Sequence, residues 1–89
     1  MAWRIDFSPK AEKELAGIDR PCAKRIVAYL REKVATSQDP RGLGKPLKGV
    51  LREFWRYRVG DYRIVTKIED ERVLVLVVRV AHRREAYRV

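Results

Sequence analysis

The sequence predicts an α+β fold in which a strand and two helices precede three further strands, in the order β-α-α-β-β-β. Three observations predict it. Apolar residues alternate with charged ones near the N-terminus, the next stretch repeats them at helical spacing, and the second half returns to strand patterns separated by short turns. A chain of 89 residues has room for one domain, residues 1–89, and only a thin core.

The first strand is indicated by Trp3, Ile5 and Phe7, whose alternation with charged residues is typical of a strand with one buried face. Ser8 and Pro9 then favour the start of a helix. Serine at an N-cap accepts a backbone N–H, and proline in the first turn lacks only a donor that the turn does not need. We expect a short amphipathic helix to follow.

A second helix is predicted over residues 21–36, where an apolar stripe follows Asp19-Arg20-Pro21. Because few residues separate the two helices, we expect an antiparallel helical hairpin. Glycine and proline are frequent in residues 37–49, which should form the longest loop.

The second half predicts three strands, over residues 51–59, 62–68 and 73–80, with a tight hairpin turn at Gly60. The last of these is almost continuously apolar, as a central strand covered on both faces would be. We therefore expect it to lie antiparallel between the third strand and the first. This gives a four-stranded antiparallel sheet of order 2-3-4-1, with the helical hairpin packed on one face.

The charge of the chain is strongly basic, with 21 Lys and Arg against 12 Asp and Glu and a net charge of +9. Most of the excess lies in two segments, since residues 45–63 carry +4 and residues 79–89 carry +3. Such an excess implies attraction to a polyanion or to an acidic partner.

Several classes of protein are excluded early. Cys22 is the one cysteine and His82 the one histidine, so an internal disulfide and a cysteine metal cluster are excluded, and we expect no metal and no cofactor. The apolar run over residues 73–78 is too short to span a bilayer, and no signal peptide is visible. We expect a cytoplasmic protein.

Strand geometry places the basic residues more closely. Arg56 and Arg58 are two residues apart and leave the same face of their strand, while Tyr57 should face the helices. Arg63, just past the turn, could stand beside them. Converging guanidinium groups would hold phosphate, although basic residues on an open sheet face can also be merely solvated.

A resemblance to a known family covers essentially the whole chain. Residues 55–65, Trp-Arg-Tyr-Arg-Val-Gly-Asp-Tyr-Arg-Ile-Val, resemble the central signature of the RelE/ParE toxin superfamily, and residues 80–87 resemble its closing segment. The segments around residues 7–15 and 39–49 agree with its first helix and its loop. The resemblance implies the same order of elements and the toxin half of a toxin–antitoxin pair, with an acidic RelB-like antitoxin as partner.

RelE-type members cut mRNA in the ribosomal A site without a metal, by attack of the 2′-hydroxyl on the adjacent phosphate. The resemblance therefore implies a ribosome-dependent endoribonuclease. The residues expected to act in catalysis are Arg58, Arg63, His82, Arg83 and Tyr87, and those expected to bind RNA are Lys45, Lys48, Arg52, Arg56 and Arg84.

One departure from the family concerns the general base. The basic strand positions often hold lysine in the ribosomal nucleases, whereas arginine, with a pKa above about 12, is a poor base. His82 or Tyr87 would then transfer the proton, or the arginines would act only electrostatically. Two alternatives share the fold: a ParE-like poison of DNA gyrase, and a degenerate member that binds without catalysis.

Overall fold

The computed structural model describes residues 2–49 and 53–84. In chain order the elements are β1 (Arg4–Phe7), α1 (Pro9–Ala16), α2 (Arg20–Tyr29), a π-helical continuation η1 (Leu30–Val34), a 3-10 helix η2 (Pro40–Leu43), β2 (Lys45–Pro46), β3 (Phe54–Val59), β4 (Tyr62–Glu69) and β5 (Leu74–His82). No helix in these residues is long and apolar enough to cross a membrane.

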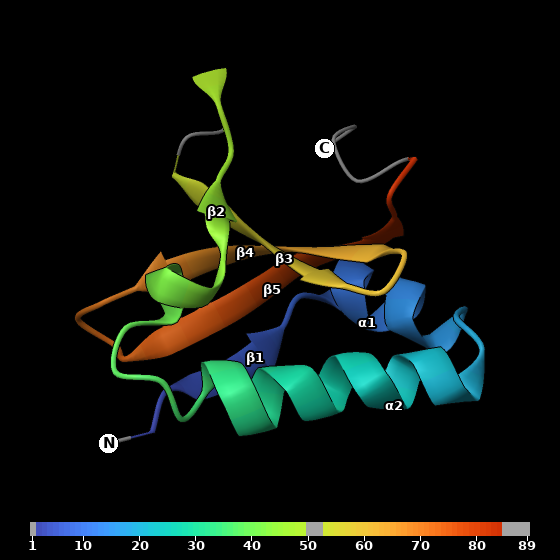
Figure 1. The fold of residues 1–89 in the computed structure, drawn as a ribbon, viewed down its shortest axis with the longest axis horizontal. Coiled ribbons are helices and arrows are strands. Elements are labelled where there is room, and N and C mark those ends of the chain that lie inside the picture. Colours follow the sequence, from blue (N-terminus) through green and yellow to red (C-terminus); the bar gives the residue numbers. More distant parts are fainter. Residues whose placement is uncertain (1, 50–52, 85–89) are drawn as a thin grey trace.

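The strands form one mixed sheet of order β1-β5-β4-β3-β2 (Figure 1). The neighbour order expected for the four predicted strands is confirmed. Two expectations were wrong. β1 pairs with β5 in parallel, so the sheet is not purely antiparallel, and the short β2 adds a fifth strand beside β3.

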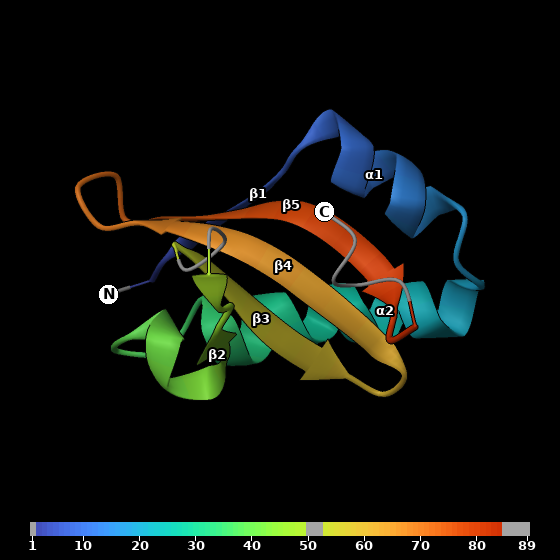
Figure 2. The ribbon, with the colours of Figure 1, turned by 90° about the horizontal axis from the view of Figure 1, so that it is seen from above.

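The parallel pairing follows from the path of α1. After β1 ends, the Ser8 N–H donates to the Val77 carbonyl at 2.8 Å, and the Ser8 hydroxyl donates to the Val78 carbonyl at 3.2 Å. The chain thus continues along β5 into α1 instead of turning back, and only α2 returns along the sheet (Figure 2). One reversal instead of two leaves β1 parallel to β5, and the predicted helical hairpin, in which both helices reverse the chain, was wrong for the same reason.

Both helices lie on one side of the sheet, as expected (Figure 1). The predicted N-cap at Ser8 is confirmed, because Ser8 Oγ accepts from the Ala11 N–H at 3.1 Å. At the predicted start of the second helix, Asp19 Oδ2 accepts from the Cys22 N–H at 3.3 Å. The buried cluster between helices and sheet consists of Ala11, Ile26, Leu30, Val34, Tyr57, Val59, Ile64, Val75, Val77 and Val80.

A bulge in β5 decides which side chains reach each face near its end. Thr66 pairs with Val77 and Val65 pairs with Arg79, so Val78 is one residue too many for β4. An extra residue moves every following side chain to the opposite face. Beyond the bulge, even-numbered residues such as Val80 therefore face the helices, and Arg79 faces the open side.

Candidate active site on the open face of the sheet

The hairpin between β3 and β4 brings two arginines face to face. Gly60, with φ of 58°, turns the chain so that Arg58 pairs directly with Arg63 across the strands. Glycine adopts this left-handed conformation without steric cost. Like charges directly opposite each other in a sheet are destabilising. The pairing of Arg58 with Arg63 is therefore expected to lower the stability of the hairpin.

Arg63 is the most constrained of these side chains. It is only 8% exposed, and its Nη1 donates to the Gly60 carbonyl at 3.2 Å and to the Tyr62 carbonyl at 3.1 Å. Neutral carbonyls orient the guanidinium but do not neutralise it. Burial, and then the charges of Arg58, Arg56 and Arg83, lower the pKa of Arg63 below its ordinary value.

Arg83 joins the same group from the end of β5. Its backbone N–H donates to the Asp61 carbonyl at 2.8 Å, which ties the exposed residue to the hairpin turn. Its charge is close enough to act on Arg63. We name Arg56, Arg58, Arg63 and Arg83 the arginine cluster. Among residues 2–49 and 53–84, no ion pair involves Arg58, Arg63 or Arg83.

The cationic surface extends from the arginine cluster to the edge of the sheet. Lys45 of β2 pairs with Arg56 of β3, so both leave the open face. Lys48 and Arg84, two further residues expected to bind RNA, are exposed near the ends of this surface. Arg52 and Tyr87 lie outside the described residues.

His82 lies on the other face of the sheet. It pairs with Tyr62, and the two rings meet edge to face with centroids 5.9 Å apart. Tyr62 pairs in turn with Val59, a member of the core cluster. Because directly opposite residues share a face, His82 belongs to the helix side, whereas Arg58 and Arg63 belong to the open side. The structure does not bring His82 together with the arginine cluster.

A pocket of about 150 Å³ near the hairpin turn is lined by Cys22, Arg25, Val59, Gly60, Asp61 and Tyr62, on the helix side and away from the arginine cluster. The described residues contain no group of three or more His, Cys, Asp or Glu side chains that could hold a metal ion. Because Arg58 and Arg83 are exposed and hydrogen bonds fix the Arg63 guanidinium, the arginine cluster can hold an extended anion by charge and by fixed donors.

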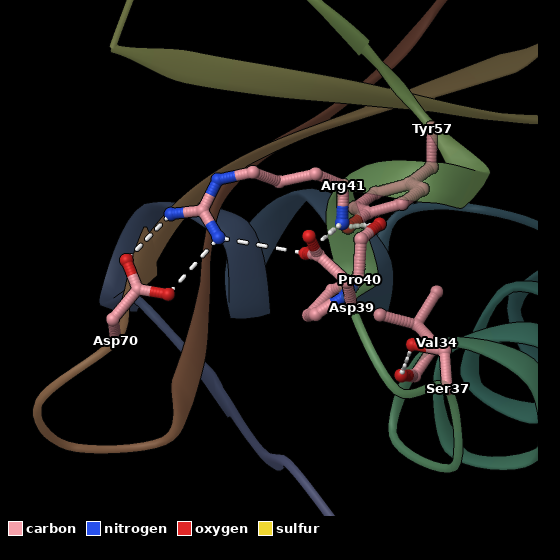
Figure 3. A network of polar contacts seen from close by, with 7 residues as sticks. All are labelled: Val34, Ser37, Asp39, Pro40, Arg41, Tyr57 and Asp70. Carbon is pink, nitrogen blue, oxygen red and sulfur yellow. Dashed lines mark hydrogen bonds and ion pairs between the residues drawn. The ribbon is translucent and has the colours of Figure 1, made fainter.

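A second polar network, which the sequence did not predict, lies at the other end of the sheet (Figure 3). Arg41 donates to the two carboxylate oxygens of Asp70 at 3.0 and 2.6 Å and to Asp39 at 3.5 Å, and its guanidinium lies 6.0 Å from the centre of the Trp55 ring. The bond to Asp70 raises the pKa of Arg41 and lowers that of Asp70. Here the cation is fully compensated.

Comparison with known proteins decides the family. The family model for the ParE toxin of the type II toxin–antitoxin system parDE matches residues 5–87. The chain belongs to the RelE/ParE superfamily of type II toxins. The toxin is 30% identical to toxin RelG of Mycobacterium tuberculosis over 88 residues, 99% of each chain. It is 34% identical to toxin RelE of the same organism over 77 residues, which cover 75% of this toxin and 79% of that protein.

Solved structures agree with the fold of the toxin. A RelBE toxin–antitoxin complex of Mycobacterium tuberculosis matches with a TM-score of 0.84 at 26% identity, covering 92% of each chain. A double arginine-to-alanine mutant of the E. coli RelE toxin in the free state matches with a TM-score of 0.77 at 27% identity, covering 97% of this toxin and 88% of that chain. The RelE-like α+β fold with its mixed sheet is therefore shared.

Proposed function

We propose that this toxin is a metal-independent, ribosome-dependent endoribonuclease that cleaves mRNA in the A site and thereby inhibits translation. The observation that carries the proposal is the arginine cluster. Three cations lie close to the nearly buried Arg63 at the open face, and the two carbonyls that hold Arg63 carry no charge to neutralise it. An oligoanion supplies the missing negative charge, and a phosphodiester matches the planar guanidinium donors.

The reaction needs charge stabilisation more than any other contribution from the protein. The 2′-oxygen attacks the neighbouring phosphorus, the bond from phosphorus to the 5′-oxygen breaks, and the products carry a 2′,3′-cyclic phosphate and a 5′-hydroxyl. A base takes the proton of the 2′-hydroxyl and an acid gives a proton to the 5′-oxygen, so that the reaction consumes no net proton. Arg63 and Arg58 would stabilise the charge that develops on the phosphorane oxygens, and Arg83 the charge on the leaving oxygen.

Proton transfer requires a different residue, because arginine stays protonated. His82 and Tyr87 were the two candidates from the sequence. Since His82 faces the helices, we assign proton transfer to Tyr87. Tyr87→Phe should then lower the cleavage rate and remove one limb of its pH profile, whereas His82→Gln should change the rate much less.

Primer extension on ribosome-bound mRNA tests the proposal. Wild-type toxin should produce cuts, and Arg58→Ala should reduce them without loss of folding, because Arg58 is exposed. Arg72→Ala is the matched control, since Arg72 is an exposed arginine in a surface ion pair at the far end of the sheet. Absence of cuts with wild-type toxin, or equal cutting by Arg58→Ala, would contradict the proposal.

We further propose an acidic RelB-like antitoxin as partner. The similar solved structures include RelE toxins in complex with RelB antitoxins, and the net charge of +9 favours an acidic partner. The antitoxin would mask part of the cationic surface in a hetero-oligomer. Cleavage by the toxin should therefore stop when the acidic partner encoded with it is added in equal amount.

A second candidate function is poisoning of DNA gyrase, which the match to the ParE family model favours. A supercoiling assay separates the two activities. Inhibition of gyrase without mRNA cleavage would replace the nuclease proposal by this one. Expression without growth arrest would instead favour the degenerate binding member.

A further inference from the structure

β1 pairs with only the first part of β5. Beyond that point, residues of α1 and its N-cap form hydrogen bonds with the backbone at the outer edge of β5. Ser8 occupies the carbonyls of Val77 and Val78. Further along, Glu14 Oε1 accepts a hydrogen bond from the Val80 N–H at 2.8 Å. A helix side chain thus takes the place of the missing strand at the end of β5. Two residues later the same strand leads into Arg83 of the arginine cluster.

The second oxygen of Glu14 binds Arg79. Glu14 Oε2 accepts from Arg79 Nε at 3.2 Å, and the two side chains are only 22% and 11% exposed. Arg79 pairs with Val65, and Val65 pairs on its other side with Arg56. Arg79 therefore lies in the same cross-strand row as Arg56 and on the same face, but its charge is neutralised.

We propose that Glu14 is a positioning residue of the RNA site. Its carboxylate fixes the end of β5 that carries Arg83, and it withdraws Arg79 from the cationic surface. This inference rests on the proposed function. The positive charge of this surface then comes from Lys45, the arginine cluster and the exposed Lys48 and Arg84. Without the carboxylate of Glu14, Arg79 would add positive charge to the same face, across Val65 from Arg56, and would draw the phosphodiester backbone into a second, unproductive position.

Two substitutions separate the two roles of Glu14. Glu14→Gln keeps an oxygen that can accept from the Val80 N–H but removes the charge opposite Arg79. Glu14→Ala removes both. The control is Glu12→Gln, which changes the net charge by the same amount on an exposed residue of α1.

The charge role is tested with a short single-stranded RNA and with mRNA cleavage. For Glu14→Gln, the dependence of log affinity on log salt should steepen by roughly 0.7, the value for one additional phosphate contact on a single strand. KM should fall and kcat should fall with it, because tighter binding is unproductive. Glu12→Gln should match the wild-type toxin in the salt dependence of RNA affinity and in the kinetic constants of cleavage. A purely structural role of Glu14 would lower stability without steepening the salt dependence, so an unchanged slope and rate in Glu14→Gln would overturn the charge role.

The positioning role is tested by amide hydrogen exchange, which needs no RNA. Glu14→Ala should speed exchange at Val80 and Arg83 by about tenfold or more relative to Glu14→Gln, with amides in β3 unaffected. Equal exchange in the two variants would overturn the positioning role. If wild-type toxin neither binds nor cuts RNA, the proposed function fails, and the exchange result alone decides whether Glu14 holds the strand.

Discussion

Arg41 and Arg63 are both held by several hydrogen bonds, yet they have opposite electrostatic surroundings. Arg41 has two carboxylates and a tryptophan ring within reach, and its pKa is raised. Arg63 has two neutral carbonyls as hydrogen-bond partners, and burial together with the charges of three arginines outweighs the charge of Asp61, so its pKa is lowered. Carboxylates of the protein neutralise the charge of Arg41, whereas the charge of Arg63 is stabilised further when an anion binds.

The difference teaches how to separate structural arginines from functional ones in a chain with 21 basic residues. A structural arginine brings distant segments together, as Arg41 does for η2 and the turn after β4. A functional arginine is fixed in position at a net cost to stability. The sign of the charge around each guanidinium makes this distinction before any substrate is known.

The largest effect should follow from removing Arg63. Arg63→Ala should lower single-turnover mRNA cleavage by about 100-fold or more, the usual loss for one preorganised charge-stabilising donor. Arg63→Lys keeps the charge without the planar fork of donors, so its cleavage rate should lie between those of the wild-type toxin and Arg63→Ala. Arg41→Ala should cleave at close to the wild-type rate while unfolding more easily. Full cleavage by folded Arg63→Ala would remove the contrast between the two arginines.

The next effect concerns the compensated end of the sheet. The buried Tyr57 hydroxyl donates to the Pro40 carbonyl at 2.7 Å, and burial raises the pKa of Tyr57 to about 12. Tyr57→Phe leaves that carbonyl without its donor and should lower the free energy of unfolding by about 1–3 kcal/mol. Urea unfolding measures the loss. Cleavage by the folded fraction should be unchanged.

Arg58 offers an effect of the opposite sign. Because Arg58 stands directly opposite Arg63, Arg58→Thr removes a like-charge pair and places a good strand former at an exposed position. We expect the free energy of unfolding to rise by roughly 0.2–1 kcal/mol while mRNA cleavage falls. A loss of stability in urea would show that the arginine pair is not costly, which would weaken the distinction from Arg41.

The smallest effect is the acid dependence of the Arg41 network. Arg41 lowers the pKa of Asp70 below the ordinary value of 3.8 in the folded state. The unfolded state then binds a proton first as the pH falls, so this contribution to stability is present above pH 3.8 and is lost as the pH falls through the lowered folded pKa. Asp70→Asn should flatten this part of the profile. Urea midpoints measured from pH 5 to pH 2 for both proteins would show it, and parallel profiles would contradict it.

Much of the site could be predicted from the sequence because strand alternation is strictly local. The shared face of Arg56 and Arg58, and the approach of Arg63 across the Gly60 turn, need only the period of a strand and a two-residue turn. The neighbour order of the four long strands followed from their apolar patterns in the same way.

The features that the sequence did not predict have physical causes that lie outside local patterns. The bulge at Val78 falls within a continuous apolar run, where no alternation marks it, and it moves His82 to the helix side and Arg79 to the open side. The direction of β1 depends on how α1 docks along β5 through Ser8 and Glu14. Arg41 binds Asp70, which lies 29 positions away in the sequence, and only folding brings the two residues together.

The pairing of β1 with β5 also sets the order in which the protein can assemble. β5 lies between β1 and the rest of the sheet, and it is the last strand in the described part of the chain. During synthesis, β1 and α1 emerge early but have no β5 to pack against until residues 74–82 have been made. Contacts over such long sequence separations fold late. A nascent or truncated chain ending before β5 would carry Arg58 and Arg63 without the strand that brings Arg83 to them, so an incomplete toxin is expected to be harmless to the cell that makes it.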